Sequence, residues 1–203
     1  MRVGGPSAGF TIVELMIVLV VLGVVLTLGM PSISGWLQNT QIRTAAEGMV
    51  SGLQLARAEA LRRNAIVRFQ LVNNLTAGCA LSNTGRNWVI SQTDATSACN
   101  QPPSEVTPPQ IIQTKSSTEG SGNAVIAATG GAEVVFNGLG RPVGAGNLTQ
   151  IDITNTQGGA CQTVDNKEHP MRCLRVIIGT GGGVRMCDPI VADVTDPRIC
   201  VIP

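Results

Sequence analysis

The residues with the most distinctive chemistry in this 203-residue chain are one carboxylate in an apolar segment and six cysteines. Glu14 stands at the head of an apolar run, residues 15–30, in which Thr27 is the one polar side chain. A carboxylate in an apolar helix costs about 2–3 kcal/mol on insertion scales, so it marks either a charged partner or a position at the membrane surface. The sequence around Glu14 is therefore needed to distinguish these two interpretations.

The cysteines all follow the apolar run. An even number in a small domain indicates disulfides formed in an oxidising compartment. Six cysteines allow 15 pairings, so the choice stays open, and we expect sequence neighbours to pair, the last bridge holding the C-terminal tail. A zinc site is disfavoured because the chain has no C-x-x-C and a single histidine, His169, and we expect no metal or other cofactor. The expected pairs are Cys79–Cys99, Cys161–Cys173 and Cys187–Cys200.

The apolar run predicts a membrane-spanning helix. Counted from Phe10 to Met30 it has 21 residues, roughly 32 Å of helix, which is enough to cross the hydrocarbon core. A cleaved secretory signal is disfavoured, because no A-x-A-like site follows and Glu14 lies where such signals carry positive charge. Pro31 cannot donate an i−4 hydrogen bond, so we expect a helix kink there and a transmembrane half over residues 10–36.

The segment Gly9-Phe10-Thr11-Ile12-Val13-Glu14 with the apolar run resembles the processing site of type IV pilins and type II secretion pseudopilins. The resemblance implies that prepilin peptidase removes a leader, residues 1–9, by cutting between Gly9 and Phe10, and then methylates the new amino group. It also implies that Glu14 pairs with the amino terminus of a neighbouring subunit and so sets the register of helix assembly.

Beyond the apolar run, residues 37–64 predict an amphipathic second half of the helix. Gly48 and Gly52 interrupt it at four-residue spacing, which suggests close approach of a sheet or helix. The stretches 52–64 and 136–142 resemble the branch of the family that contains the pseudopilin GspH and the minor pilins FimT and FimU. The apolar face recurs at three- and four-residue steps through Ile42, Ala46, Met49, Leu53, Ala56 and Ala60.

From residue 65 to 203 the pattern predicts a β-rich head, which the cysteines and the family resemblance would place in the periplasm. Val67, Phe69 and Leu71 alternate with Arg68 and Gln70, which predicts a half-buried strand. The proline-rich stretch 94–109 predicts a loop. We therefore expect an α+β fold of the type IV pilin kind, with a long kinked N-terminal helix packed on one or two antiparallel sheets. Further strands are expected at 88–91, 110–114, 133–136, 150–154, 174–178 and 183–187.

Composition and motifs argue against an enzyme and against a general nucleic-acid binder. The net charge is +1 and the chain has five aromatic residues. His169 lies in a polar loop with no triad pattern, and the glycines at 179–183 precede a strand, which predicts a hairpin turn rather than a phosphate-binding loop.

One alternative function is DNA binding through this hairpin. FimT-type pilins implicated in DNA uptake carry Gly-Arg-x-Arg there, whereas this chain has Gly182-Gly183-Val184-Arg185. Arg185 matches the second arginine of that motif, and Arg175 on the preceding strand is a candidate for a second positive charge. Gly183 stands where the motif has its first arginine, so one phosphate contact is missing.

The sequence thus predicts a minor pilin or pseudopilin of the FimT/FimU type that acts in type IV pilus biogenesis at the filament tip. Its partners would be prepilin peptidase, the inner membrane, and other pilin or pseudopilin subunits that it meets through its N-terminal helix. The cysteines favour a single-pass topology with the N-terminus in the cytoplasm and the head in the periplasm. The alternatives are a GspH-type minor pseudopilin of a type II secretion system and a DNA-binding pilin.

Overall fold

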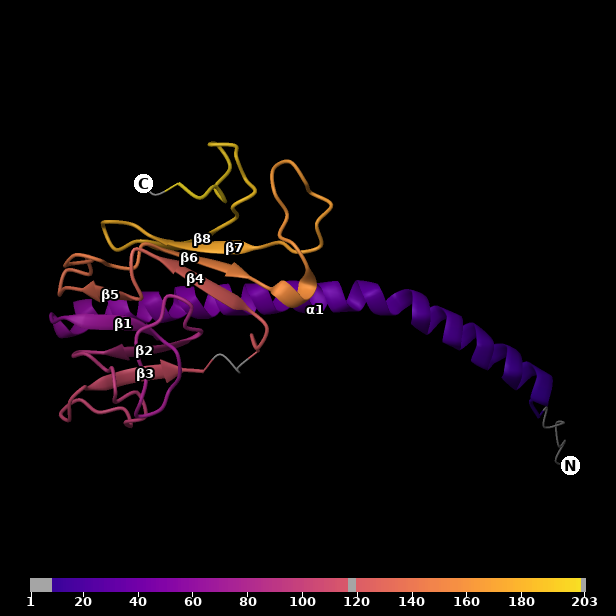
Figure 1. The fold of residues 1–203 in the computed structure, drawn as a ribbon, viewed down its shortest axis with the longest axis horizontal. Helices are drawn as coiled ribbons and strands as arrows, with labels where there is room; N and C mark the ends of the chain where they lie inside the picture. The colour runs from indigo at the N-terminus through magenta and orange to yellow at the C-terminus, as the bar shows by residue number, and fades with distance from the viewer. Residues whose placement is uncertain (1–8, 117–119, 202–203) are drawn as a thin grey trace, which may run out of the picture.

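The computed structural model describes residues 9–116 and 120–201, and the side chains of residues 27–33 also lie outside its described part. One long helix, α1 (Ile12–Arg63), runs through the molecule, and its N-terminal half projects from a β-rich head (Figure 1). Its 52 residues correspond to about 78 Å at 1.5 Å per residue. The expected kink at Pro31 lies outside the described side chains and stays a prediction.

Both ends of α1 carry recognisable caps. Thr11 is the N-cap, and its hydroxyl accepts a hydrogen bond from the backbone N–H of Glu14 at 3.2 Å. Asn64, in the left-handed conformation with φ of 45°, is the C-cap, which confirms the predicted end of the helix. In the last turn Arg62 and Arg63 both bond Glu59, and the hydrogen bond from Arg62 is the main reason that the pKa of Glu59 falls below its ordinary value.

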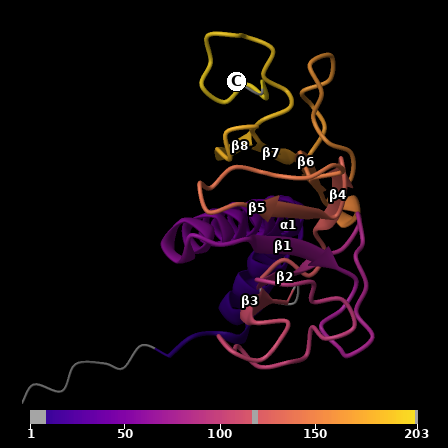
Figure 2. The same ribbon diagram turned by 90° about the vertical axis from the view of Figure 1, so that its left-hand side faces the viewer.

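In the described part of the chain, eight strands form two antiparallel four-stranded sheets beside the C-terminal half of α1 (Figures 1 and 2). The predicted strands are present, and β4 is an additional strand that we did not expect from the sequence. The first sheet has the order β3-β2-β1-β5 and the second the order β4-β6-β7-β8. The strands are β1 (Val67–Val72), β2 (Asn87–Ser91), β3 (Ile111–Lys115), β4 (Val125–Thr129), β5 (Glu133–Phe136), β6 (Gln150–Thr154), β7 (Leu174–Ile178) and β8 (Val184–Cys187).

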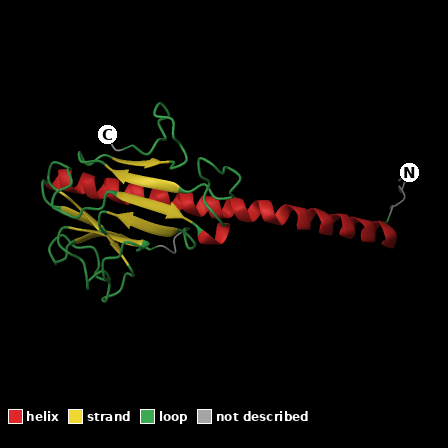
Figure 3. Cartoon of the chain, turned by 45° about the horizontal axis from the view of Figure 1, so that its top comes forward, coloured by secondary structure: helices red, strands yellow, loops and turns green. Residues whose placement is uncertain are grey.

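The main core lies between α1 and the inner faces of both sheets, so the fold is α+β as predicted (Figure 3). Every residue of the predicted apolar face of α1 is buried in it. Gly52 gives the closest approach, because a Cβ there would lie 2.9 Å from ring atoms of Phe69 and Trp88. This confirms the close approach of a sheet at Gly52, whereas Gly48 faces only the flexible end of the Lys115 side chain.

The strand β1 is buried more fully than its alternating pattern predicts. Gln70, expected on a solvated face, is completely buried, because the segment that follows β2 covers the outer side of the first sheet. Its side-chain amide donates to Asp94 at 2.9 Å and to Glu133 at 3.2 Å, and Glu133 also pairs with Arg68. Burial by itself would raise the pKa of Asp94, but hydrogen bonds from Gln70 and Thr96 outweigh it and lower that pKa.

Candidate functional site

The N-terminal half of α1 presents an uncovered apolar surface. Phe10 is 81% exposed, and the large apolar residues that follow it up to Leu26 are each at least half exposed. An apolar surface of this length is far larger than the isolated patches found on ordinary soluble domains, so it requires a covering partner. The residues concerned are Ile12, Val13, Leu15, Met16, Ile17, Val18, Leu19, Val20, Val21, Leu22, Val24, Val25 and Leu26.

Glu14 lies in the first turn of this segment, three residues after the N-cap Thr11. Thr-x-x-Glu is the pattern of a capping box, and a carboxylate at this position also interacts favourably with the positive end of the helix dipole. The carboxylate has no ion-pair partner among the described residues of this single chain. Glu14 therefore helps to start the helix and still has its charge available to a second chain.

The processing residues lie just before the helix. Gly9 and Phe10 are exposed and precede the N-cap Thr11, so the peptide bond between them lies in a non-helical segment. Leader residues 1–8 lie outside the described part of the chain. Within the part that the structure describes, no helix meets the length and apolarity needed to cross a membrane.

The structure joins the six cysteines in the three pairs expected from sequence proximity, Cys79–Cys99, Cys161–Cys173 and Cys187–Cys200. The first bridge ties the segment after β1 to the cover of the first sheet. The second closes the loop between β6 and β7, and the third ties the C-terminal tail to the end of β8. No cluster of His, Cys, Asp and Glu suited to a metal ion occurs in the described part of the chain.

The two arginines considered for DNA are both engaged within the chain. Arg175 on β7 pairs with Asp152 on β6 at 2.6 Å. Arg185 on β8 donates to the backbone carbonyls of Ile199 and Val201 in the tail. Arg185 therefore fastens the disulfide-closed tail, and neither side chain projects freely from the sheet.

The hairpin and the single histidine have structural roles. Gly179 and Gly182 form the turn between β7 and β8, and a strand rather than a helix follows, as predicted. His169 Nδ1 lies 2.7 Å from the carbonyl oxygen of Cys161 and thus stays within its own loop. Neither feature forms a catalytic arrangement.

A groove that sequence reasoning missed lies between α1, the end of β8 and the tail. Its volume is about 330 Å³, and Arg43, Arg172 and Arg198 line it together with Met186. Its floor holds Asp188, which is 3% exposed and bonds Arg172 at 2.7 Å. Arg172 directly precedes Cys173, and Asp188 directly follows Cys187. The sequence spacing does not show that the two disulfide-closed segments meet.

The tail carries a second ion pair beside this groove. Arg198 donates to Asp196, both through its side chain and through its backbone, and these bonds lower the pKa of Asp196 to about 2. The contact is local, because the two residues are two positions apart in the turn that leads to Cys200.

Comparisons with known proteins find two family matches and two similar structures. Residues 6–30 match the prokaryotic N-terminal methylation motif. Two crystal forms of the type IV minor pilin FimU of Pseudomonas aeruginosa are similar to the chain at 15% and 14% identity, covering 75% of this chain and 97% and 92% of theirs, with TM-scores of 0.43 and 0.44. No curated protein sequence matches the chain. Residues 45–189, most of the chain, match the family described as Type II transport protein GspH. The chain therefore belongs to the GspH family of minor type IV pilins and pseudopilins and carries the N-terminal methylation motif of that class.

Proposed function

We propose that this chain is a minor pilin of the FimT/FimU type that is cut between Gly9 and Phe10, methylated at Phe10, and assembled through α1 at the tip of a type IV pilus. The observation that carries the proposal is the uncovered apolar half of α1 with Glu14 in its first turn. Before assembly this half-helix lies in the inner membrane, with the N-terminus cytoplasmic and the head periplasmic. After assembly the helices of neighbouring subunits cover it.

In this proposal Glu14 supplies the register of assembly. Its carboxylate pairs with the N-terminal ammonium of Phe10 in a neighbouring subunit, because an apolar bundle leaves neither charge another partner. Apolar packing between the helices holds the subunits together, and the charge pair fixes the axial position of one helix relative to its neighbour.

Two substitutions separate this role from helix capping. Glu14→Gln removes the charge but keeps the Thr-x-x-Gln form of the capping box, whereas Thr11→Ala removes the cap and keeps the charge. We expect Glu14→Gln to remain in the membrane and to be lost from sheared filaments, and Thr11→Ala to be incorporated. Normal incorporation of Glu14→Gln would refute the charge pair.

The first measurement is mass spectrometry of filaments sheared from cells that express the chain at native level. An N-terminal peptide that begins with N-methyl-Phe10, at low stoichiometry, supports both the processing and the pilus role. A chain that still begins at Met1 would refute the processing.

The family description favours one second candidate, a GspH-type minor pseudopilin of a type II secretion system. The same measurement separates the two, because the methylated chain would then stay in the membrane fraction and be absent from sheared pili. DNA contact receives no support from the geometry, since both candidate arginines have partners within the chain.

A further inference from the structure

The five aromatic residues of the chain fall into two groups. Phe69, Trp88 and Phe136 are buried in the core of the head, and none of them is more than 3% exposed. Phe10 and Trp36 are 81% and 66% exposed. The two exposed aromatic side chains therefore lie at either end of the segment that the proposed function places in the membrane.

The spacing of Phe10 and Trp36 matches the thickness of a bilayer. Trp36 lies 26 residues after Phe10. At 1.5 Å per residue this separation is about 39 Å of helix. A bilayer is about 40–45 Å thick with its headgroup layers, and its hydrocarbon core is about 30 Å. With Phe10 at the cytoplasmic face, the indole of Trp36 lies in the periplasmic headgroup layer.

The exposed surface of α1 changes from apolar to polar directly after Trp36. Leu37, the next residue, is 48% exposed and apolar. Beyond it every exposed position of α1 up to residue 54 is polar, and these positions are Thr40, Arg43, Glu47, Ser51 and Gln54. Tryptophan at a boundary of this kind is typical of a membrane–water interface.

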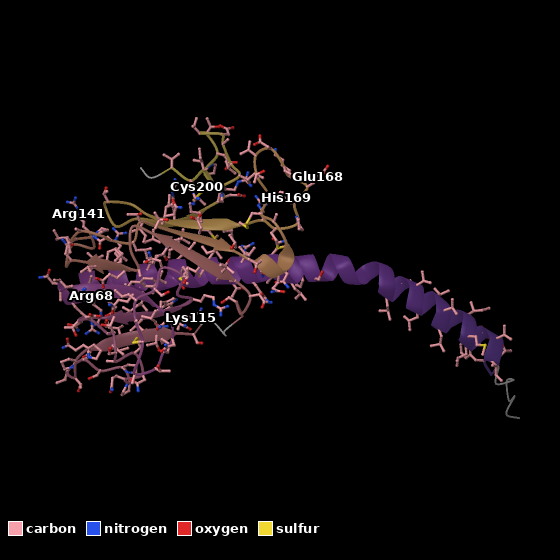
Figure 4. The ribbon with its side chains drawn as sticks, viewed as in Figure 1. Arg68, Lys115, Arg141, Glu168, His169 and Cys200 are labelled. Atoms are coloured by element: carbon pink, nitrogen blue, oxygen red, sulfur yellow. A yellow bond between two sulfur atoms is a disulfide. The ribbon has the colours of Figure 1, made fainter. Side chains whose placement is uncertain are left out.

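The indole of Trp36 is suited to a headgroup layer and is free to enter it. It combines a large apolar ring with one N–H donor, and this N–H has no hydrogen-bond partner among the described residues. Side chains of an α-helix lean toward its N-terminus, which for Trp36 is the direction of the bilayer. Figure 4 shows the side chains of the projecting half of α1 standing clear of the head.

The head is attached to α1 less than one turn beyond Trp36. The Asn39 side chain donates to the carbonyl of Pro170 at 3.1 Å and accepts from the backbone N–H of Arg172 at 2.8 Å. These bonds hold the loop between β6 and β7 on the helix. The depth of the indole in the bilayer therefore fixes the height of the head above it.

We propose that Trp36 binds the headgroup layer of the periplasmic leaflet while the chain is stored in the membrane, and so sets the position of the head at the membrane surface. Phosphate and ester oxygens of the lipid accept from the indole N–H, and the first acyl carbons cover the ring. The inference rests on the proposed function, because it requires the apolar half of α1 to lie in the bilayer.

The test uses the full-length chain in vesicles of phosphatidylethanolamine and phosphatidylglycerol at a low protein-to-lipid ratio. A nitroxide quencher is placed either on the lipid headgroup or deep in the acyl chain, and tryptophan fluorescence is measured. Trp36→Phe gives the background from Trp88, which is buried and stays in every variant. Two reference variants add a new indole to Trp36→Phe, namely Leu22→Trp within the apolar segment and Gln54→Trp on the exposed face of α1 beside the head.

After subtraction of the background, the headgroup nitroxide should quench Trp36 several-fold more strongly than the acyl-chain nitroxide does. The Leu22→Trp indole should show the opposite order, and the Gln54→Trp indole should be quenched by neither. If Leu22→Trp behaves as expected but Trp36 is quenched by neither nitroxide, or more by the acyl-chain one, the inference is overturned and the membrane location of α1 stands. If the acyl-chain nitroxide does not quench Leu22→Trp, the apolar half of α1 is not in the bilayer, and the membrane step of the proposed function is overturned as well.

Discussion

Replacing Gly52 by alanine tests how closely α1 packs on the first sheet. The new methyl group would lie 2.9 Å from Phe69 Cε2 and from two ring atoms of Trp88, which is too close for carbon atoms. Those rings already contact each other, with centroids 5.6 Å apart, so they have little room to move. Overpacking of this kind costs about 1–3 kcal/mol, and it is offset by about 1 kcal/mol of better helix propensity. We expect a net loss of about 1 kcal/mol.

Gly48, one turn earlier on the same helix, provides the matched control. A methyl group there would meet the end of the flexible Lys115 side chain at 3.2 Å, and the amine can move away. Gly48→Ala should therefore gain about 0.5–1 kcal/mol from helix propensity alone. The difference between the two variants isolates the packing cost at Gly52.

The assay is thermal unfolding of the full-length chain in detergent, followed by near-UV circular dichroism of the buried Trp88. A difference of about 2 kcal/mol corresponds to a Tm difference of about 4–8 °C between the two variants. If Gly52→Ala were as stable as Gly48→Ala, the close packing of α1 on β1 and β2 would be refuted.

Three further predictions concern the head. Cys187→Ser with Cys200→Ser should cost about 3 kcal/mol from a bridge that spans 13 residues, and tryptic cleavage of the tail should accelerate. Glu59 and Asp94 have pKa values below their ordinary values of 4.5 and 3.8, so their charged forms stabilise the fold. This stabilisation is fully present above the ordinary pKa values and is lost as the pH falls through the lowered ones. Acid unfolding followed by Trp fluorescence should show this, with a shallower loss below about pH 4 in Asp94→Asn. Gly182→Ala should lower the Tm by several degrees, because φ is +81° there and a Cβ would overlap the carbonyl oxygen of a facing turn.

The sequence predicts the parts of this fold that depend on local periodicity. The apolar face of α1, the helix end at Asn64 and the hairpin at 179–183 follow from spacing and turn chemistry, and the structure contains all three. Neighbouring cysteines pair because each pair brackets a loop or the tail beside an antiparallel strand. These features need only contacts that are short in sequence.

The missed features depend on contacts between distant segments. Strand β4 was not predicted, because Val125–Thr129 contains two alanines and lies in a Gly- and Ser-rich context that favours loop. The sequence pattern predicts that Gln70 is solvated, but in the structure the loop from 92 to 110 covers it. In both cases the partner that decides the outcome is too far along the chain for a pattern to show.

Arg185 shows how such distant contacts change a functional interpretation. By sequence it is the arginine that remains from a nucleic-acid motif, on a hairpin with an exposed turn. In the structure Ile177 and Arg185 are register partners on the face of β7 and β8 that the tail covers, and Ile177 is 2% exposed. The Cys187–Cys200 bridge holds the tail where the carbonyls of Ile199 and Val201 accept from the guanidinium. The tail carbonyls therefore already occupy Nη2 of Arg185. A residue that remains from a sequence motif does not by itself preserve a binding site.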